Sequence, residues 1–209
     1  MSKTSSPEHN PGIQGYYKLH AKIYDMSRWA FLFGRDRIFN LLPKDFSPGT
    51  ILEVGCGTGV GLQRIHKRYP EAKIVGIDAS ADMLEKAEQK VAAGELPAAL
   101  KCEYYGRQSL KEQSVDAVLF SYCLTMINPG WEKAMENALR HLKPGGYLLI
   151  VDFHDSDVAA FKKWMGVNHV RMDSHLLAKA NNMVKLERHK VSKAYFGLWK
   201  YVMLAGRKV

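Results

Sequence analysis

Short runs of β-branched and aliphatic residues alternate with amphipathic stretches through the middle of the chain. Such runs predict strands, and apolar residues at helical spacing predict the helices between them. Strands are expected at residues 50–54, 73–78, 100–105, 115–120 and 147–151. Helices are expected at residues 60–69, 83–93 and 131–142. Strands that alternate with helices form a parallel sheet covered on both faces, so the pattern predicts an α/β fold.

The N-terminal part follows a different pattern. Residues 1–12 are polar and predict a loose arm. From Gly15 to Leu42 apolar and aromatic residues recur in steps of three and four, which predicts one or two helices broken near Gly34.

The C-terminal part also leaves the alternation. Residues 157–180 have a helical pattern. Residues 184–194 and 198–205 face each other across a Tyr-Phe-Gly sequence, and they predict an antiparallel hairpin at the sheet edge. No run of 18 apolar residues and no secretory signal is found, so neither a transmembrane helix nor export is expected.

Charge is distributed unevenly along the chain. The 209 residues carry a net charge of +9, with 46% hydrophobic and 24% charged residues, which is typical of a folded domain. The whole excess lies in residues 160–209, where Asp173 and Glu187 are the only acids. A basic region indicates nucleic acid, an acidic membrane surface or an acidic substrate as partner, and a solvated face is the alternative.

The cysteines exclude two classes of protein. Cys56, Cys102 and Cys123 are widely spaced, and no pair has C-x-x-C spacing. A zinc site or a disulfide framework is therefore not expected, and reduced thiols in the cytoplasm fit best.

The first strand leads into a glycine-rich segment that runs from Glu53 to Gly59. Glycines at a strand-to-helix turn let the backbone approach a ligand and adopt unusual φ angles, although such turns also occur without a ligand. Asp78 ends the second strand, 19 residues after Gly59. In a Rossmann-like sheet a carboxylate at this place reaches the ribose hydroxyls of a nucleoside.

These motifs together resemble the class I S-adenosylmethionine (SAM)-dependent methyltransferases. The resemblance rests on E-x-G-x-G-x-G, on Asp78, on Met83-Leu84 and on Leu-Lys-Pro-Gly-Gly at residues 142–146. It implies a Rossmann-like, doubly wound sheet of seven mostly parallel strands, with a C-terminal antiparallel hairpin and N-terminal helices. A single domain is expected, with an arm and capping helices at 1–46, a cofactor-binding core at 47–153 and an acceptor-side part at 154–209.

The resemblance also implies a cofactor site for SAM. The residues that it assigns to this site are Glu53, Gly55, Gly57, Gly59, Asp78, Ala79, Met83, Gln108 and Ser121. The three glycines would contact the methionine part, and Ala79 and Met83 would flank the adenine. The family often places an acid near the end of strand three, whereas residues 106–109 here read Gly-Arg-Gln-Ser, so the amide of Gln108 is the expected substitute. The alternative is a similar sheet that binds another ligand.

Segments that flank the core carry a narrower resemblance. They lie at residues 17–36, 120–127, 151–153, 168–173 and 197–201. Together they are similar to the methyltransferases of betaine-lipid synthesis, which trimethylate the amine of diacylglycerylhomoserine, and to the related phospholipid N-methyltransferases, which methylate phosphatidylethanolamine. This resemblance implies a lipid with an amine headgroup as acceptor, and another protein for the aminocarboxypropyl transfer.

Methyl transfer to an amine requires mainly placement of an unprotonated nitrogen opposite the methyl group. Tyr24 and Tyr122 are candidates for the residue over the methyl site, because aromatic faces attract methylated ammonium groups. Each can equally be a packing tyrosine. Asp152 ends strand five and is a candidate base, while a helix-capping role suits the acids that follow it equally well.

Basic residues outside the core are candidates for the acceptor headgroup. Arg171 suits a carboxylate because arginine pairs with carboxylates in bidentate fashion, and His169 and His154 are expected near it. Arg28 and Arg35 are candidates for contact with phosphate or carboxylate, or they are exposed and structural. The aromatic N-terminal helix either lies in a membrane interface or caps the pocket.

A monomer at the cytoplasmic face of an anionic membrane is expected, with no metal and no nucleic acid as partner. Methyltransferases of exocyclic amines carry Asn-Pro-Pro-aromatic after strand four, whereas this chain has Ser-Tyr-Cys-Leu at residues 121–124. Two alternatives stay open. The protein can be a methyltransferase of small soluble amines, or a non-catalytic partner that binds cofactor and membrane.

Overall fold

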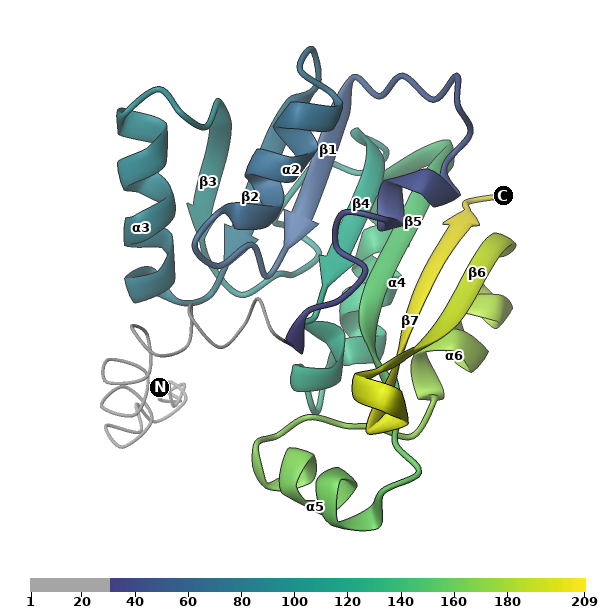
Figure 1. The fold of residues 1–209 in the computed structure, drawn as a ribbon. Helices are drawn as coiled ribbons and strands as arrows, with labels where there is room; N and C mark the ends of the chain where they lie inside the picture. The colour runs from purple at the N-terminus through teal and green to yellow at the C-terminus, as the bar shows by residue number, and fades with distance from the viewer. Residues whose placement is uncertain (1–30) are drawn as a thin grey trace, which may run out of the picture. The chain divides into compact units, whose positions relative to one another are not determined.

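The computed structural model describes residues 31–209, and a single seven-stranded sheet forms its centre (Figure 1). The strand order is β3-β2-β1-β4-β5-β7-β6. The strands are β1 (Thr50–Val54), β2 (Lys73–Asp78), β3 (Ala98–Cys102), β4 (Val115–Ser121), β5 (Leu142–Asp155), β6 (Lys185–Ala194) and β7 (Trp199–Arg207). The first five are parallel, and β7 is antiparallel to both neighbours. The predicted doubly wound α/β fold with an edge hairpin is therefore confirmed.

Five α-helices accompany the sheet in the described part of the chain. They are α2 (Val60–Arg68), α3 (Ala81–Ala92), α4 (Trp131–His141), α5 (Ala159–Val167) and α6 (His175–Met183). Three short 3₁₀ helices lie between the larger elements: η1 (Ile38–Leu41), η2 (Leu124–Met126) and η3 (Tyr195–Gly197). Figure 1 shows α4 and α6 behind the sheet and α2 and η1 in front of it. Both faces of the central strands are thus covered, as a parallel sheet requires.

The core lies between β4, β5, β7 and the helices α4 and α6. Val118, Phe120, Leu148 and Ile150 on the central strands are completely enclosed there. Central strands of this composition bury apolar side chains on both faces, which fixes the register of the sheet. The carboxyl ends of β1, β2, β4 and β5 consequently meet at one edge. None of the helices at residues 31–209 has the length and apolar content to cross a membrane.

The Leu-Lys-Pro-Gly-Gly segment, which precedes the strand expected at residues 147–151, is itself part of the sheet. It belongs to β5, which pairs Leu142 with Val115 before an irregularity moves the register to Tyr147 and Ala117. Gly145, with a φ of 75°, donates its N–H to the carbonyl of Lys208. The C-terminal residues thus hold this segment in the sheet, which a local pattern does not reveal.

Between Gly34 and the first strand, the chain is less helical than predicted. After Gly34 only η1 forms, and Pro43 follows it. Gly34 has a φ of 86°, and a Cβ there would lie 2.8 Å from the sulfur of Met203 and from the ring of Tyr201. The positive φ and the close approach to β7 therefore exclude a helix that continues through this glycine.

The predicted helix over 157–180 is two helices joined by an extended segment. His169 and Ser174 both have positive φ values, 62° and 63°. Between them Val170 and Met172 are buried, and the N–H of Arg171 donates to the carbonyl of Thr125 at 3.0 Å. Docking of this segment against η2 interrupts the helical pattern.

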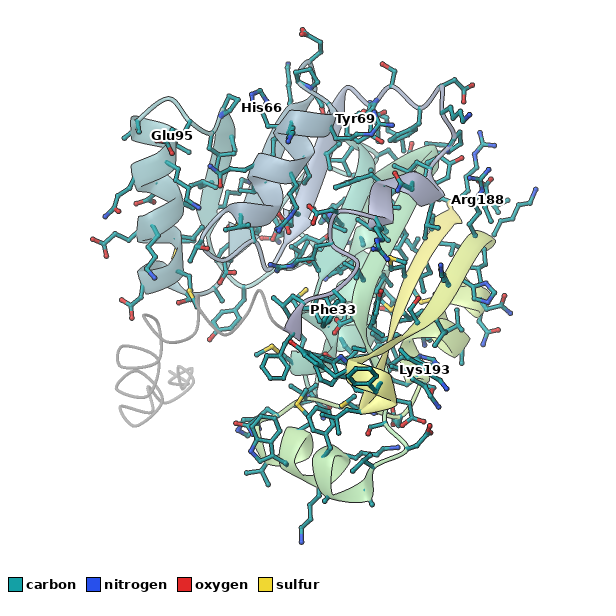
Figure 2. The ribbon with its side chains drawn as sticks, in the orientation of Figure 1. Phe33, His66, Tyr69, Glu95, Arg188 and Lys193 are labelled. Carbon is teal, nitrogen blue, oxygen red and sulfur yellow. The ribbon has the colours of Figure 1, made fainter. Side chains whose placement is uncertain are left out.

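The basic excess divides into paired and unpaired cations. Four of the cations form ion pairs: Lys162 with Asp155, Lys179 with Glu132, Lys200 with Asp157 and Arg171 with Asp173. Others lie on the exposed edge strand β6, where no ion pair is found within residues 31–209: Lys185, Arg188, Lys190 and Lys193. Figure 2 shows Arg188 and Lys193 toward opposite ends of this strand.

Candidate functional site

The turn between β1 and α2 is built on three glycines with positive φ. Gly55, Gly57 and Gly59 have φ values of 71°, 54° and 77°. The N–H of Gly55 donates to the carbonyl of Ile77 at 2.8 Å, which ties the turn to β2. A Cβ at Gly55 would lie 2.7 Å from the Cβ of Cys123, so no larger residue fits there. The turn therefore presents bare backbone at the carboxyl edge of the sheet.

The carboxylate of Asp78 joins this turn to the start of α3. Its Oδ2 accepts the N–H of Gly57 at 2.7 Å, and its Oδ1 accepts the N–H of Ser80 at 2.9 Å. Ser80 is the N-cap of α3, where its hydroxyl accepts the N–H of Met83 at 3.4 Å. Asp78 is half-buried, and each carboxylate oxygen has a further lone pair to offer. The arrangement suits a ligand with hydroxyl donors, such as a ribose.

The candidate residues near Asp78 differ in how far they are exposed to solvent. Ala79 is exposed, and Met83 is buried in the first turn of α3. Gln108 is exposed, in the loop between β3 and β4. Glu103 was missed in the sequence because the strand was expected to continue to residue 105. It directly follows β3, and its N–H donates to the carbonyl of Asp78 at 3.0 Å.

Glu53 lies below the surface of this site. It is 1% exposed, and its carboxylate lies against the first turn of α2. A Cβ on Gly61 would be only 2.0 Å from Oε1 of Glu53. A helix N-terminus favours a negative charge, so this carboxylate is placed to hold α2 beside the glycine turn.

Three of the expected site residues meet at the end of β4. Arg35 donates from Nε to Oγ of Ser121 at 2.9 Å. The hydroxyl of Tyr122 donates to the carbonyl of Phe33 at 2.7 Å, and its ring meets Phe153 edge-on with centroids 4.9 Å apart. Burial raises the pKa of Tyr122 well above its ordinary value, so the hydroxyl stays protonated. These contacts hold residues 33–35 over the ends of β4 and β5.

Asp152 is completely enclosed and faces η2. Its Oδ1 accepts the hydroxyl of Thr125 at 2.6 Å and the N–H of Phe153 at 2.8 Å. Burial raises the pKa of Asp152 to about 6, against the lowering effect of these hydrogen bonds. The carbonyl of Thr125 in turn accepts the N–H of Arg171, so Asp152 holds η2 and, through it, the segment before α6.

Changing Asp152 to asparagine is expected to flatten the pH dependence of stability. Folding raises the pKa of Asp152 from 3.8 to about 6, so the protonated side chain contributes its full stabilisation of the fold below pH 3.8. This contribution is lost as the pH rises through 6. The difference amounts to about 3 kcal/mol at most. Asp152→Asn keeps an acceptor for the Thr125 hydroxyl and loses the longer bond, at 3.3 Å, from the Thr125 N–H. Because it also removes the cost of a buried charge, it should be about as stable as the wild type at pH 7.5. Thermal unfolding between pH 4 and 7.5 measures this, and strong destabilisation at pH 7.5 would contradict it.

Arg171 is engaged by the chain's own side chains. Its Nε forms an ion pair with Asp173 at 2.7 Å, and its guanidinium lies 5.7 Å from the ring centroid of Trp131. The other oxygen of Asp173 contacts Nδ1 of His175. His169 is an exposed turn residue after α5, and its N–H donates to the carbonyl of Gly166 at 3.0 Å.

His154 lies at the end of β5 and lines a shallow pocket of about 380 Å³. The other lining residues are Asp155, Ser174, Val191, Ser192, Lys193 and Lys200. Burial lowers the pKa of His154, which keeps the imidazole neutral at pH 7. Tyr24 and Arg28 lie outside the described residues. At residues 31–209 no group of three or more His, Cys, Asp or Glu side chains could hold a metal ion.

Comparisons with known proteins agree with this geometry. Residues 51–146 match the family model of a methyltransferase domain. A tRNA N(3)-methylcytidine methyltransferase of Schizosaccharomyces pombe is 30% identical over 157 residues, 71% of this chain and 50% of that protein. A ubiquinone/menaquinone biosynthesis C-methyltransferase of Desulfotalea psychrophila is 27% identical over 146 residues, 68% of this chain and 58% of that protein. The chain thus spans little more than half the length of these relatives.

Solved structures share the fold. A SAM-dependent methyltransferase of Aquifex aeolicus has a TM-score of 0.69 at 19% identity, over 97% of this chain and 100% of its own. The N-methyltransferase NodS of Bradyrhizobium japonicum, solved with S-adenosylhomocysteine, has a TM-score of 0.67 at 15% identity, over 83% and 85%. In its fold, and in sequence over residues 51–146, the chain is similar to the class I SAM-dependent methyltransferases.

Proposed function

We propose that the protein transfers methyl groups from SAM to the amine of a lipid headgroup. The observation that carries methyl transfer is the Asp78 carboxylate, held against the N–H of Gly57 at the edge where β1 and β2 end. This is where open α/β sheets bind nucleoside ligands. The chain fits SAM because a half-buried carboxylate and a bare glycine turn lie side by side.

The residues that would hold SAM follow from their positions. Gly55, Gly57 and Gly59 would face the methionine part, with Glu53 supporting their turn from below. Asp78 would accept from the ribose hydroxyls. Ala79, Met83 and Gln108 remain candidates for the adenine, and Glu103 is added to them because it adjoins Asp78.

The sulfonium group supplies a good neutral leaving group, so the protein has mainly to bind and orient the two reactants. Ser121 and Tyr122 lie at the end of β4, next to the glycine turn, and they form the floor of the acceptor position. Because burial keeps the proton on Tyr122 and its hydroxyl donates to the carbonyl of Phe33, Tyr122 does not serve as a base. The enclosed Asp152 acts through Thr125 as a positioning residue.

The lipid amine as acceptor is supported by the sequence flanks that resemble the betaine-lipid and phospholipid N-methyltransferases. Diacylglycerylhomoserine is the acceptor that we favour, with phosphatidylethanolamine as the alternative. Arg35 is a candidate for the headgroup because it reaches Ser121 from the N-terminal side. The membrane that carries such lipids would be the partner at the cytoplasmic face.

Incubating the purified protein with SAM and detergent-dispersed amine lipids tests this function. Mass spectrometry should detect mono-, di- or trimethylated headgroups together with S-adenosylhomocysteine. Asp78→Ala is the matched inactive control. Turnover of soluble amines alone, or no methylated product from either lipid, would contradict the proposed acceptor.

Methyl transfer to RNA is a second candidate function, favoured by the similarity to one relative and by the positive charge of β6. That relative is the fission yeast tRNA methyltransferase, and the unpaired cations of β6 would suit a phosphate backbone. A transcript bound with steep salt dependence and methylated by the protein would support RNA and displace the lipid proposal.

A further inference from the structure

Aromatic side chains from three parts of the chain form one cluster at the carboxyl edge of the sheet. Phe161 of α5 stacks on Trp199 of β7, with ring centroids 5.4 Å apart, and Trp164 lies 5.8 Å from Phe161. Tyr195 of η3 lies 4.9 Å from Trp199 and 5.4 Å from Phe33. Figure 1 shows α5 and the turn between β6 and β7 at the edge where β4 and β5 end. The cluster therefore borders the candidate site.

The outer members of this cluster face solvent. Trp199 at its base is fully enclosed, whereas Trp164 is 54% and Tyr195 is 46% exposed. Phe196 follows Tyr195 in η3 and is 112% exposed. We call the exposed apolar residues of α5 and η3 the apolar face: Val158, Trp164, Val167, Tyr195 and Phe196. Exposed apolar residues that adjoin one another mark an interaction surface, unlike single scattered ones.

The backbone at η3 holds Phe196 outward at a conformational cost. Tyr195 and Phe196 have φ values of 46° and 57°, in the left-handed region. Asparagine and glycine are the usual residues there, because bulky side chains are strained. A strained turn that displays an aromatic ring to solvent indicates that the ring has a binding role.

Cations border the apolar face. Lys162 and Lys163 lie on α5, and Lys193 and Lys200 lie beside η3. Lys162 and Lys200 are paired with Asp155 and Asp157, which leaves the group with two excess positive charges. Lys193 and Lys200 also line the shallow pocket together with His154 and two serines. Figure 2 shows Lys193 close to the turn that carries Phe196.

We propose that the apolar face docks on an anionic lipid bilayer, with Phe196 and Trp164 entering the interface. Tryptophan and phenylalanine supply apolar area at the headgroup level, and lysines extend to the acidic headgroups. Docking would turn the carboxyl edge of the sheet toward the membrane. The inference rests on the proposed lipid acceptor, since it gives the candidate site access to a lipid without a transmembrane segment.

Co-sedimentation with vesicles tests docking without turnover. The vesicles contain phosphatidylcholine with or without phosphatidylglycerol, and neither SAM nor an amine lipid is present. The wild type should prefer the anionic vesicles, with an affinity that falls as salt rises. Phe196→Ala and Trp164→Ala should each lower the partition coefficient about tenfold, from the apolar area lost. Val209→Ala removes apolar area beyond the end of β7 that lies opposite η3, where the side chain is 96% exposed, and it should have no effect.

Two double variants with reversed charge test whether the lysines beside the apolar face contribute to vesicle binding. Lys163→Glu combined with Lys193→Glu should lower binding to anionic vesicles by about tenfold or more. Lys185→Glu combined with Arg188→Glu makes the same change of charge at the opposite end of β6, and its effect should be clearly smaller. Circular dichroism and thermal unfolding establish that each variant is folded.

Three results would overturn the proposal. The first is equal binding to neutral and anionic vesicles, and the second is binding that the combined Phe196→Ala and Trp164→Ala substitutions leave unchanged. The third is a wild-type dimer that Phe196→Ala dissociates, because this would assign the apolar face to contact with a second copy of the chain. Failure to dock while detergent-dispersed amine lipid is methylated refutes docking alone. Docking without methylation of any lipid refutes the proposed acceptor alone.

Discussion

Replacing Asp78 by alanine is expected to weaken SAM binding about a hundredfold or more. The carboxylate would accept charge-assisted hydrogen bonds from the ribose, and it already fixes the N–H groups of Gly57 and Ser80. Two such bonds, at about 1.5 kcal/mol or more each, correspond to an affinity loss of about a hundredfold. Titration calorimetry with S-adenosylhomocysteine measures the loss directly.

The control for this substitution lies one turn further along the chain. Asp82 is an exposed acid in the first turn of α3, and no contact to the glycine turn is found for it in residues 31–209. Asp82→Ala removes the same charge and should keep the wild-type affinity. Asp78→Asn should fall between wild type and Asp78→Ala, since it keeps one acceptor oxygen. Unchanged affinity of Asp78→Ala in a folded protein would refute the role of Asp78.

Replacing Gly61 by alanine is expected to destabilise the fold by about 3 kcal/mol or more, the upper end of what overpacking costs. The added Cβ would lie 2.0 Å from Oε1 and 2.4 Å from Oε2 of Glu53, which is itself enclosed. Because Glu53 is enclosed, its carboxylate can move only against neighbouring side chains; otherwise α2 must shift away from β1. Because α2 follows the glycine turn directly, SAM affinity should fall as well. Chemical denaturation measures the loss of stability.

A shorter side chain at position 53 tests whether the clash with Glu53 causes the stability loss of Gly61→Ala. Glu53→Asp withdraws the carboxylate by one methylene, so the Glu53→Asp, Gly61→Ala double variant should regain part of the stability. Gly166→Ala is the matched control, because a Cβ at this helical position meets nothing within 4 Å. It should be neutral or stabilising by up to about 1 kcal/mol. Additive effects of the two changes at Glu53 and Gly61 would contradict the steric explanation.

Local patterns predicted the parts of the fold that depend on burial. The runs at β1, β2 and β4 are apolar because both of their faces are covered, and β2 ends at Asp78 as expected. Where a distant partner decides the conformation, the pattern was insufficient. The segment at 142–146 is drawn into the sheet by the C-terminal residues, and Gly34 is placed by its contact with Met203.

The candidate site shows the same division. The spacing from the glycines to Asp78 is a local property of two strands and a turn, and the sequence was sufficient to predict it. The partners of Tyr122, Asp152 and Arg171 are Phe33, Thr125 and Asp173, and their hydrogen bonds arise only when separate loops meet. Glu103 was obscured for a simpler reason, since β3 ends three residues earlier than its pattern indicates.

The cationic side chains of β6 also bear on how the protein behaves at high concentration. β6 is the last strand in the sheet order, so in the described part of the chain one row of its backbone N–H and C=O groups is unpaired. Such a row can template the addition of a strand from another molecule and start a fibre. Closely spaced lysines repel a second copy of the same strand, and the register irregularity between Leu186 and Arg188 interrupts a flat edge. Neutralising these lysines would therefore be expected to promote aggregation even if folding and catalysis were untouched.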